Sequence, residues 1–427
     1  MAIMTSELLQ QVRVIDPVAK TDRIADVAIS DGVIKAVQDN IVEWSSDTQV
    51  RDCRGLVLGP GLIDLYSHSG EPGFETRETL LSLLEAAAAG GFTRLCILPD
   101  TMPSLDNLAG IVGVEQKRRE LIAQTLPKMY IWGAMTIGVQ GQQMTELAEL
   151  AVGAVGFADG KPIQNLALLR RLLEYLQPLG KPVALWCCDR QLAGNGVMRE
   201  GTDSIILGLP GNPNFSETTA IAALLELVAA IGTPIHIMRV STARSVQLIQ
   251  QAKAHGLPIT ASTSWMHLLL DTKSHYNYDP NLRLEPPLGN PGDRTALQEA
   301  VRLGVVDAIA LDLAPYTYEE KTVAFAEAPP GVIGFELALA LLWQYFVENG
   351  QWSALELWRC LSLNPAECLQ QTVGEICPGN PAELTLFAPQ QSWLVEPQTL
   401  KSLATNTPWL GQKITGRVVQ TWVGKFP

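Results

Sequence analysis

The sequence predicts an α/β protein: a (β/α)₈ barrel with a small β-sandwich domain built from both termini. Three observations carry this prediction. From about residue 57 to residue 340, short apolar runs alternate with longer amphipathic stretches. Both ends of the chain instead carry short runs of alternating polarity, separated by turn signals. The length of 427 residues suits one large domain and a smaller one.

The barrel rests on a repeated order of strand and helix. Several stretches between the strands place apolar residues three and four apart, as helices with one buried face do, at residues 79–89, 165–179, 216–231 and 243–254. The expected strands are residues 57–65, 93–98, 129–136, 152–157, 182–187, 234–240, 258–263 and 307–313. Eight such strands favour a closed barrel, whose chemistry gathers at the carboxyl ends of its strands.

The terminal segments are too short to bury both faces of a sheet alone. Expected strands near the N-terminus are residues 12–15, 26–29, 33–37 and 48–52, and residues 382–425 show the same pattern. We therefore expect the two ends to pair in one small β domain. The predicted division is residues 1–56 and 366–427 for the β domain, and residues 57–365 for the barrel.

Composition excludes several classes of function. The net charge is −13 and no run rich in Lys or Arg is present, which argues against a nucleic-acid partner. No apolar stretch reaches the roughly 20 residues of a membrane span, and the first residues lack a secretory pattern, so a cytoplasmic protein is expected. The seven cysteines are scattered and odd in number, which indicates reduced thiols.

Several motifs are spread along nearly the whole chain. The segment GPGLIDLYSH at residues 59–68 opens the series, and LAGNGVMREG at residues 192–201 lies near its middle. The other stretches are residues 71–75, 86–91, 98–103, 240–243, 278–282, 307–315, 319–336, 362–366, 379–387 and 406–408. These motifs are similar, in the same order, to those of the dihydroorotases of the amidohydrolase superfamily, and this resemblance implies an amidohydrolase-type barrel.

That resemblance also implies a chemistry, because dihydroorotases close dihydroorotate from carbamoyl aspartate. They use one or two zinc ions and an aspartate that shuttles a proton. A divalent cation polarises the substrate carbonyl and acidifies a water, so its ligands must be imidazoles and carboxylates. The resemblance therefore lets each ligand position be compared with this chain.

Three histidine ligand positions of the family are occupied here by Tyr66, Trp186 and Arg239. A phenol with a pKa near about 10 is a poor ligand at neutral pH, an indole only donates, and a guanidinium is a cation. The ligand positions that remain are His68, Asp159 and Asp312, an incomplete set in which Asp312 is also the remnant of the proton-shuttling aspartate. No cofactor is expected, and zinc is the expected ion if any metal is retained.

The substrate positions implied by the resemblance have changed as well. Arginines that hold an anionic substrate in the family fall at Gly70 and Gly289, and an asparagine that shares this work falls at Asp100. Glu285 makes the pocket-closing segment more acidic, and Leu313 stands where a histidine follows the shuttling aspartate. These positions no longer favour an anion.

Together these changes predict a dihydroorotase-like pseudoenzyme of pyrimidine biosynthesis with a structural or regulatory role. The resemblance makes aspartate carbamoyltransferase the leading partner, and we also expect a homo-oligomer. One alternative is an active dihydroorotase, or another cyclic amidohydrolase, with an unusual metal site. Another is a sensor that binds a small molecule in the remodelled pocket.

One residue is expected to take over from the metal. Two close carboxylates without a cation repel each other, and a guanidinium can bridge them with paired hydrogen bonds. We therefore expect Arg239 to bridge Asp159 and Asp312 at the barrel mouth. Tyr66 and Trp186 would then fill the volume left by imidazoles and water.

Overall fold

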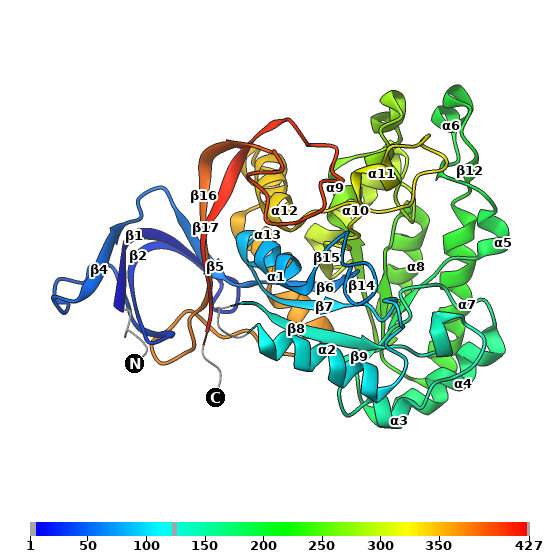
Figure 1. Cartoon of the computed structure of the whole chain (residues 1–427), viewed down its shortest axis with the longest axis horizontal. Helices are drawn as coiled ribbons and strands as arrows, with labels where there is room; N and C mark the ends of the chain where they lie inside the picture. The colour runs from blue at the N-terminus through cyan, green and yellow to red at the C-terminus, as the bar shows by residue number, and fades with distance from the viewer. Residues whose placement is uncertain (1–5, 122–125, 425–427) are drawn as a thin grey trace.

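The computed structural model describes residues 6–121 and 126–424 of the chain. Figure 1 shows a β-rich part that holds both ends of the chain and, beside it, a larger part in which helices surround strands. This is the mixed α/β arrangement that the sequence predicted. No helix within the described ranges is long and apolar enough to cross a membrane.

The larger part is a barrel of eight parallel strands, which confirms the predicted order of strands. They pair in the orders β6-β7-β8-β9 and β10-β13-β14-β15. A parallel bridge between Phe157 and Val183 joins the two groups, and the amide of His68 donates to the carbonyl of Leu313 (2.7 Å) where the barrel closes. The strands are β6 (Leu62–Ser67), β7 (Phe92–Ile97), β8 (Lys128–Gly133), β9 (Gly156–Phe157), β10 (Ala184–Trp186), β13 (Ile235–Met238), β14 (Ile259–Ser264) and β15 (Ala308–Ala310).

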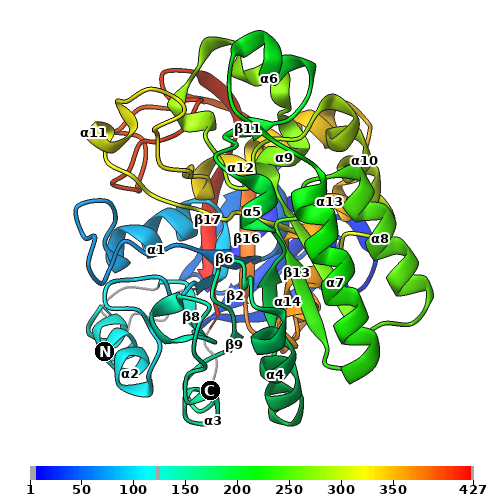
Figure 2. The ribbon, with the colours of Figure 1, turned by 90° about the vertical axis from the view of Figure 1, so that its right-hand side faces the viewer.

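Helices surround the barrel, as Figure 2 shows from the side that carries α4 and α7. The four helices expected from spacing are present, and local signals fix their ends: Thr79 and Ser82 form a capping box before α1, and Thr242 caps α8. The larger helices are α1 (Leu80–Ala89), α2 (Leu108–Glu120), α4 (Leu166–Leu176), α7 (Phe215–Ile231), α8 (Ala243–Ala254), α10 (Pro291–Leu303), α12 (Phe335–Leu342) and α13 (Ala354–Leu361). Shorter elements are α3 (Leu147–Leu150), α5 (Arg190–Ala193), β11 (Met198–Arg199), α6 (Thr202–Leu207), β12 (Gly211–Asn212), α9 (Trp265–Leu269), α11 (Tyr318–Lys321) and α14 (Leu363–Cys368).

Strands from both termini form the small β domain as one seven-stranded sheet, in the order β17-β16-β5-β1-β2-β3 with β4 paired to β1. The strand expected over residues 57–65 is in fact two strands, β5 and β6. The first belongs to this sheet and the second to the barrel, so the sheet extends past the expected boundary at residue 56. The strands are β1 (Ser6–Asp16), β2 (Thr21–Ser30), β3 (Val33–Gln38), β4 (Thr48–Asp52), β5 (Val57–Pro60), β16 (Glu383–Leu394) and β17 (Lys413–Val423).

The barrel interior is filled by side chains. Inward-facing residues of the strands, among them Ile63, Tyr66, Trp132 and Met238, form one apolar cluster. The indole of Trp132 lies across this interior and donates to the carbonyl of Leu65 (2.9 Å). The barrel is therefore a packed core with an opening only at its end.

The segment between β16 and β17, residues 395–412, leaves the β domain and reaches the barrel mouth (Figure 1); we call it the strap. The carboxylate of Glu336 accepts the amides of Lys401 (2.8 Å) and Ser402 (3.4 Å), and that of Glu78 accepts the amide of Leu403 (3.1 Å). Further along, Asn406 binds the backbone of the mouth loops. The β domain thus holds the loops that surround the site.

Candidate active site

A cavity of about 210 Å³ opens at the carboxyl ends of the barrel strands. Six of the eleven residues singled out from the sequence line it: His68, Asp100, Trp186, Arg239, Glu285 and Asp312. The other five, Tyr66, Gly70, Asp159, Gly289 and Leu313, lie outside its lining. We call His68, Asp100, Arg239 and Asp312 the mouth cluster.

Arg239 lies at the centre of the mouth cluster, just after β13. Its guanidinium grips Asp312 with two hydrogen bonds, Nε to Oδ2 (2.8 Å) and Nη2 to Oδ1 (2.6 Å), and Nη1 donates to the carbonyl of Gly160 (2.9 Å). Arg239 and Asp312 both have left-handed backbone, with φ of 57° and 50°, a conformation that costs a non-glycine residue energy. Burial opposes the charge of Arg239, yet the Asp312 carboxylate raises its pKa.

His68 continues the cluster on the other side of the guanidinium. Nη2 of Arg239 lies 3.0 Å from Nε2 of His68, and Nδ1 of His68 lies 2.7 Å from Oδ2 of Asp100. A guanidinium only donates, so Nε2 accepts and the proton of the neutral ring is on Nδ1, donated to Asp100. Burial works against the Asp100 carboxylate, but the His68 imidazole and the Arg239 charge lower its pKa. The lone pair that would bind a metal is therefore occupied by Arg239.

The expectation that Arg239 bridges both aspartates is correct for Asp312 and wrong for Asp159. The carboxylate of Asp159 accepts the amides of Met135 (2.7 Å) and Thr136 (3.1 Å), and Oδ2 accepts the Thr136 hydroxyl (2.5 Å). Burial raises the pKa of Asp159 to about 6 in spite of these bonds. The loop after β8 thus satisfies Asp159 and draws it away from Arg239.

Below the mouth cluster, Tyr66 ends a chain of polar side chains inside the barrel. Its hydroxyl accepts the amide of Arg239 (3.1 Å) and lies 2.8 Å from the hydroxyl of Ser262. His236 continues the chain, with Nε2 2.8 Å from Ser262 and Nδ1 2.9 Å from Thr260. Burial raises the pKa of Tyr66 and lowers that of His236 to about 3, so both are neutral. A neutral phenol at this position supports the backbone of Arg239.

Sequence reasoning missed a second ion pair at the mouth. Arg190, the first residue of α5, donates to both carboxylate oxygens of Glu285 (2.6 and 3.1 Å). The guanidinium carbons of Arg190 and Arg239 each lie 4.8 Å from the ring centre of Trp186, a cation–π distance. Residues 190 and 285 are 95 positions apart, and no local pattern links them. The acidic change at Glu285 is therefore balanced by a cation.

The two glycines expected to stand in place of anion-binding arginines, Gly70 and Gly289, have no room for a side chain. A Cβ on Gly70 would lie 2.3 Å from the carbonyl oxygen of Glu78, and one on Gly289 would lie 2.6 Å from Cβ of Asp293. Leu313 is 1% exposed and packs in the apolar core. The loops have thus closed around smaller residues.

The donors at the mouth do not fit a zinc ion. A tetrahedral site needs about four ligands with free lone pairs. Here Nε2 of His68 and both oxygens of Asp312 accept from Arg239, and Asp159 accepts from the loop after β8. Across residues 6–121 and 126–424, no three His, Cys, Asp or Glu side chains converge as a metal ion requires. The guanidinium supplies the positive charge at this place.

Two cysteines follow β10 near the cavity but are buried thiols. Cys187 packs in the outer apolar cluster and Cys188 in the inner one, as neighbours on extended chain do. Burial raises the pKa of Cys187, and that of Cys188 to about 11. Neither thiol is activated as a ligand or nucleophile.

Comparison with known proteins places these features in context. Residues 57–424 match the model of the Amidohydrolase family. A probable dihydroorotase-like protein of Synechocystis sp. is 44% identical, with 97% of this chain and 99% of that protein covered. The dihydroorotase of Syntrophus aciditrophicus is 36% identical, with 97% of each covered, and that of Pelotomaculum thermopropionicum is 38% identical, with 96% and 95% covered.

Solved structures show the same fold at lower identity. The L-hydantoinase (dihydropyrimidinase) from Arthrobacter aurescens is 21% identical, with a TM-score of 0.82 over 99% of each chain. A dihydropyrimidinase from Brevibacillus agri is 20% identical, with a TM-score of 0.80 over 98% of this chain and 95% of that one.

Proposed function

The chain belongs to the amidohydrolase family, and from this premise we propose that it is a dihydroorotase-like protein that has lost dihydroorotase catalysis. The relatives from Syntrophus aciditrophicus and Pelotomaculum thermopropionicum are named dihydroorotases, which supports a relation to the enzymes of pyrimidine biosynthesis. Within that group the proposed role is structural or regulatory.

One observation carries the proposal: a guanidinium occupies the centre of the site. Arg239 is bonded to Asp312, to Nε2 of His68 and to the Gly160 carbonyl, and its side chain is 4% exposed. A divalent cation entering here would have to displace a charge that is already fully paired. Nothing at the mouth then polarises a carbonyl as a metal does.

The substrate side supports the same conclusion. Dihydroorotate and carbamoyl aspartate carry carboxylates, which require a cation with free donors. Both arginines of the lining are committed, Arg190 to Glu285 and Arg239 to Asp312, and Gly70 and Gly289 leave no space for another. Lys161 is the remaining cation of the lining, and its single ammonium lacks the paired donors of an arginine. Asp100 adds a negative charge to the same wall.

Metal content and turnover, measured on one preparation, test this proposal. The purified protein is dialysed, its metals are quantified by elemental analysis, and the reaction is assayed in both directions. The dihydroorotase of Syntrophus aciditrophicus, prepared identically, is the positive control. We expect far less than one zinc per chain and no turnover above background. A near-stoichiometric metal together with turnover would overturn the proposal.

The proposed partner is aspartate carbamoyltransferase, and self-association is proposed as well. Both follow from a barrel whose scaffold is retained while its site is not. Obligate interfaces commonly bury more than about 2,000 Å², so such a complex survives gel filtration. The test mixes the chain with aspartate carbamoyltransferase of its own organism and follows co-elution. A monomer that elutes apart from that enzyme would contradict this role.

A second candidate, a sensor of a small molecule, is favoured by two unsatisfied atoms. Nε1 of Trp186 and Nδ1 of His267 are buried without a hydrogen-bond partner, and both residues line the cavity. Both atoms have almost no accessible surface, so a bound molecule with one acceptor and one donor would satisfy them once the two side chains turn toward the cavity. Calorimetry with dihydroorotate and with carbamoyl aspartate separates the two functions. Saturable binding of either compound without its conversion would support a sensor function. If neither compound binds, the protein is not a sensor of these two compounds.

A further inference from the structure

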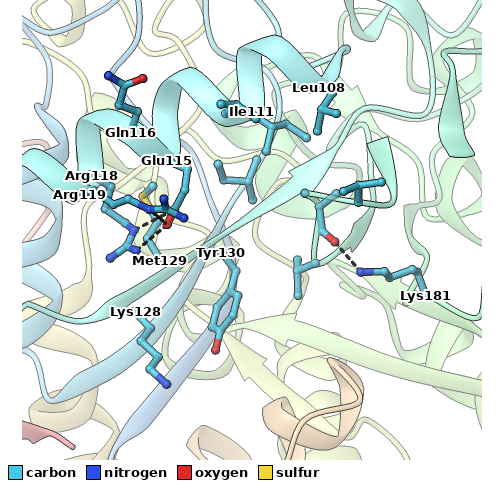
Figure 3. A pocket seen from close by; sticks show the side chains of 16 residues that line it. Leu108, Ile111, Glu115, Gln116, Arg118, Arg119, Lys128, Met129, Tyr130 and Lys181 are labelled. Carbon is cyan, nitrogen blue, oxygen red and sulfur yellow. Dashed lines mark hydrogen bonds and ion pairs between the residues drawn. The ribbon is translucent and has the colours of Figure 1, made fainter. Parts of the chain in front are cut away.

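A groove of about 1050 Å³ lies on the outer surface of the barrel (Figure 3). Leu108 and Ile111 of α2 form one wall, and Met129 of β8 lies in the floor. The lips carry two exposed valines, Val112 (53% exposed) and Val152 (80% exposed). The middle of the groove is therefore apolar and open.

The groove exists because one helix of the barrel is very short. The longest helices between β9 and β10, between β10 and β13 and between β13 and β14 have 11, 17 and 12 residues, whereas α3, between β8 and β9, has 4. In a (β/α)₈ barrel, a helix after each strand covers the outer face of the sheet. Here α2 and the short α3 leave part of the surface beside β8 and β9 uncovered.

The ends of the groove are basic on an acidic molecule. Arg118, Arg119 and Lys128 lie at one end and Lys181 at the other (Figure 3). Glu115 is the one carboxylate in the lining, and it is shared by Arg118 and Arg119. Even without Lys128, the three cations Arg118, Arg119 and Lys181 outnumber that carboxylate, in contrast to the net charge of −13 for the whole chain.

From the open space and the charge together, we infer that this groove docks an amphipathic helix of a partner protein, with its apolar side inward and acidic residues toward the groove ends. The apolar floor takes the hydrophobic face, as in other helix-in-groove complexes. Charge complementarity favours an acidic helix over a basic one. The groove lies beside the N-terminal ends of β8 and β10, opposite the mouth, so this inference does not depend on the proposed function.

The test uses a matched pair of synthetic peptides of about 15 residues, long enough for four helical turns. Both have the same leucine face, and the other face carries glutamate in one and lysine in the other. Binding to the full chain is followed by fluorescence anisotropy at low and high salt. We expect saturable binding of the acidic peptide, about tenfold or more tighter than that of the basic peptide, and weaker at high salt.

Two single substitutions locate the binding site. Val152→Asp places a negative charge on the groove lip and should lower the affinity for the acidic peptide by about tenfold or more. Ile205→Asp, on α6 and 81% exposed, is the matched control and should bind as the unchanged chain does. Circular dichroism checks that both variants fold.

Three results would overturn the inference. They are equal binding of the two peptides, absence of saturable binding by the acidic peptide, and unchanged binding by Val152→Asp. Sedimentation velocity tests whether a second copy of this chain occupies the groove. Self-association of the chain that Val152→Asp abolishes would show that a second copy of this chain fills the groove instead.

Discussion

The mouth cluster and the strap meet at the same end of the barrel, yet their residues differ in how closely they resemble those of dihydroorotases. In the strap, Asn406, Thr407 and Pro408 match the motif of that family. In the mouth cluster, Arg239 stands where the resemblance to dihydroorotases predicts a histidine ligand. The strap binds backbone atoms, whereas a ligand at that position would bind a metal. Under the proposed function, contacts that hold the loops are kept while contacts that perform chemistry are replaced.

The comparison leads us to expect that the two sets of contacts are energetically separate. Asn406 bonds to the backbone of Ala314, Tyr316 and Gly331, and none of these bonds uses a side chain of the mouth cluster. The pair of Arg239 and Asp312 is likewise a folding contact, because it neutralises a buried charge. Four predictions test or sharpen this separation.

The largest expected effect is on stability, from the centre of the mouth cluster. Arg239→Met removes the partner of Asp312 and should lower the free energy of unfolding by about 3–5 kcal/mol, the usual cost of an unpaired buried charge. Chemical denaturation measures the loss. Arg170→Met, at an exposed ion pair with Glu174, is the control and should change stability by less than about 1 kcal/mol.

A double substitution tells a charge effect from a packing effect. Arg239→Met with Asp312→Asn removes both charges and should regain part of the stability lost in Arg239→Met alone. If the double variant is less stable than the single one, the pair is not what makes Arg239 stabilising.

A somewhat smaller loss of stability is expected from a substitution in the strap. Asn406→Ala leaves two buried carbonyls and one buried amide without their partner, and should cost about 2–4 kcal/mol. Asn349→Ala, an exposed site, serves as the control. Limited proteolysis should then cut near residues 400–410 sooner than in the unchanged chain. Unchanged stability and cleavage would show that the strap does not hold the loops.

A third effect, on pH dependence, is expected where Glu336 holds the strap. Burial, with a contribution from nearby Glu78, raises the pKa of Glu336 to about 7 despite the amides that it accepts and the nearby charge of Lys401. Because the folded pKa lies above the unfolded one, the folded state binds the extra proton. The contribution of Glu336 to stability is then largest at acidic pH and is lost as pH rises through about 7.

Glu336→Gln should therefore reduce the fall in unfolding free energy between about pH 5 and pH 8 by about 1–2 kcal/mol. Denaturation at several pH values measures it. Glu367→Gln, on the exposed side of α14, should leave the pH profile as it is. Burial raises the pKa of Asp64 and Asp159 in the same window, so part of the fall remains in every variant. If Glu336→Gln has the same pH profile of stability as the unchanged chain, Glu336 is not a source of the pH dependence.

The smallest expected effect is on activity. Arg239→His restores one imidazole, but Tyr66 and Trp186 remain at the other ligand positions, and Gly70 still lacks an anchor. A working site needs all of these together. No dihydroorotase turnover above background is therefore expected in a coupled assay. Measurable turnover from this single change would mean that the remaining residues of the mouth can support catalysis, contrary to what their contacts indicate.

Sequence patterns predicted the fold well because each element depends on local signals. The helix expected over residues 243–254 is α8 (Ala243–Ala254), since Thr242 caps it and apolar residues repeat at helical spacing. The prediction of one strand over residues 57–65 was wrong, because this segment forms two strands, β5 and β6. The chain passes there from one sheet to another at Gly61, where a Cβ would lie 2.1 Å from Thr93. Apolar character does not show such a change of partner.

The sequence indicated which residues stand at the site, but it indicated fewer of the contacts that these residues make. The pairing of Arg239 with Asp312 follows from the charges that the strand ends bring together. The choice between Asp159 and Asp312 was not predictable, because amides of the loop after β8 decide it. Asp100 was expected only to repel an anion, and its bond to His68 depends on a loop geometry that no motif encodes.

The tight loops at Gly70 and Gly289 would make the proposed loss of catalysis hard to reverse by evolution. An arginine at either position would collide with the backbone carbonyl of Glu78 or with Asp293, so the change would be harmful before it could be useful. Both loops would have to be rebuilt first, a sequence of steps that selection for activity cannot guide. Asp100 and Glu285 face the open cavity, where substitution meets no such barrier. Under the proposed function, a lineage carrying this chain would have an easier path to a new ligand than to dihydroorotate.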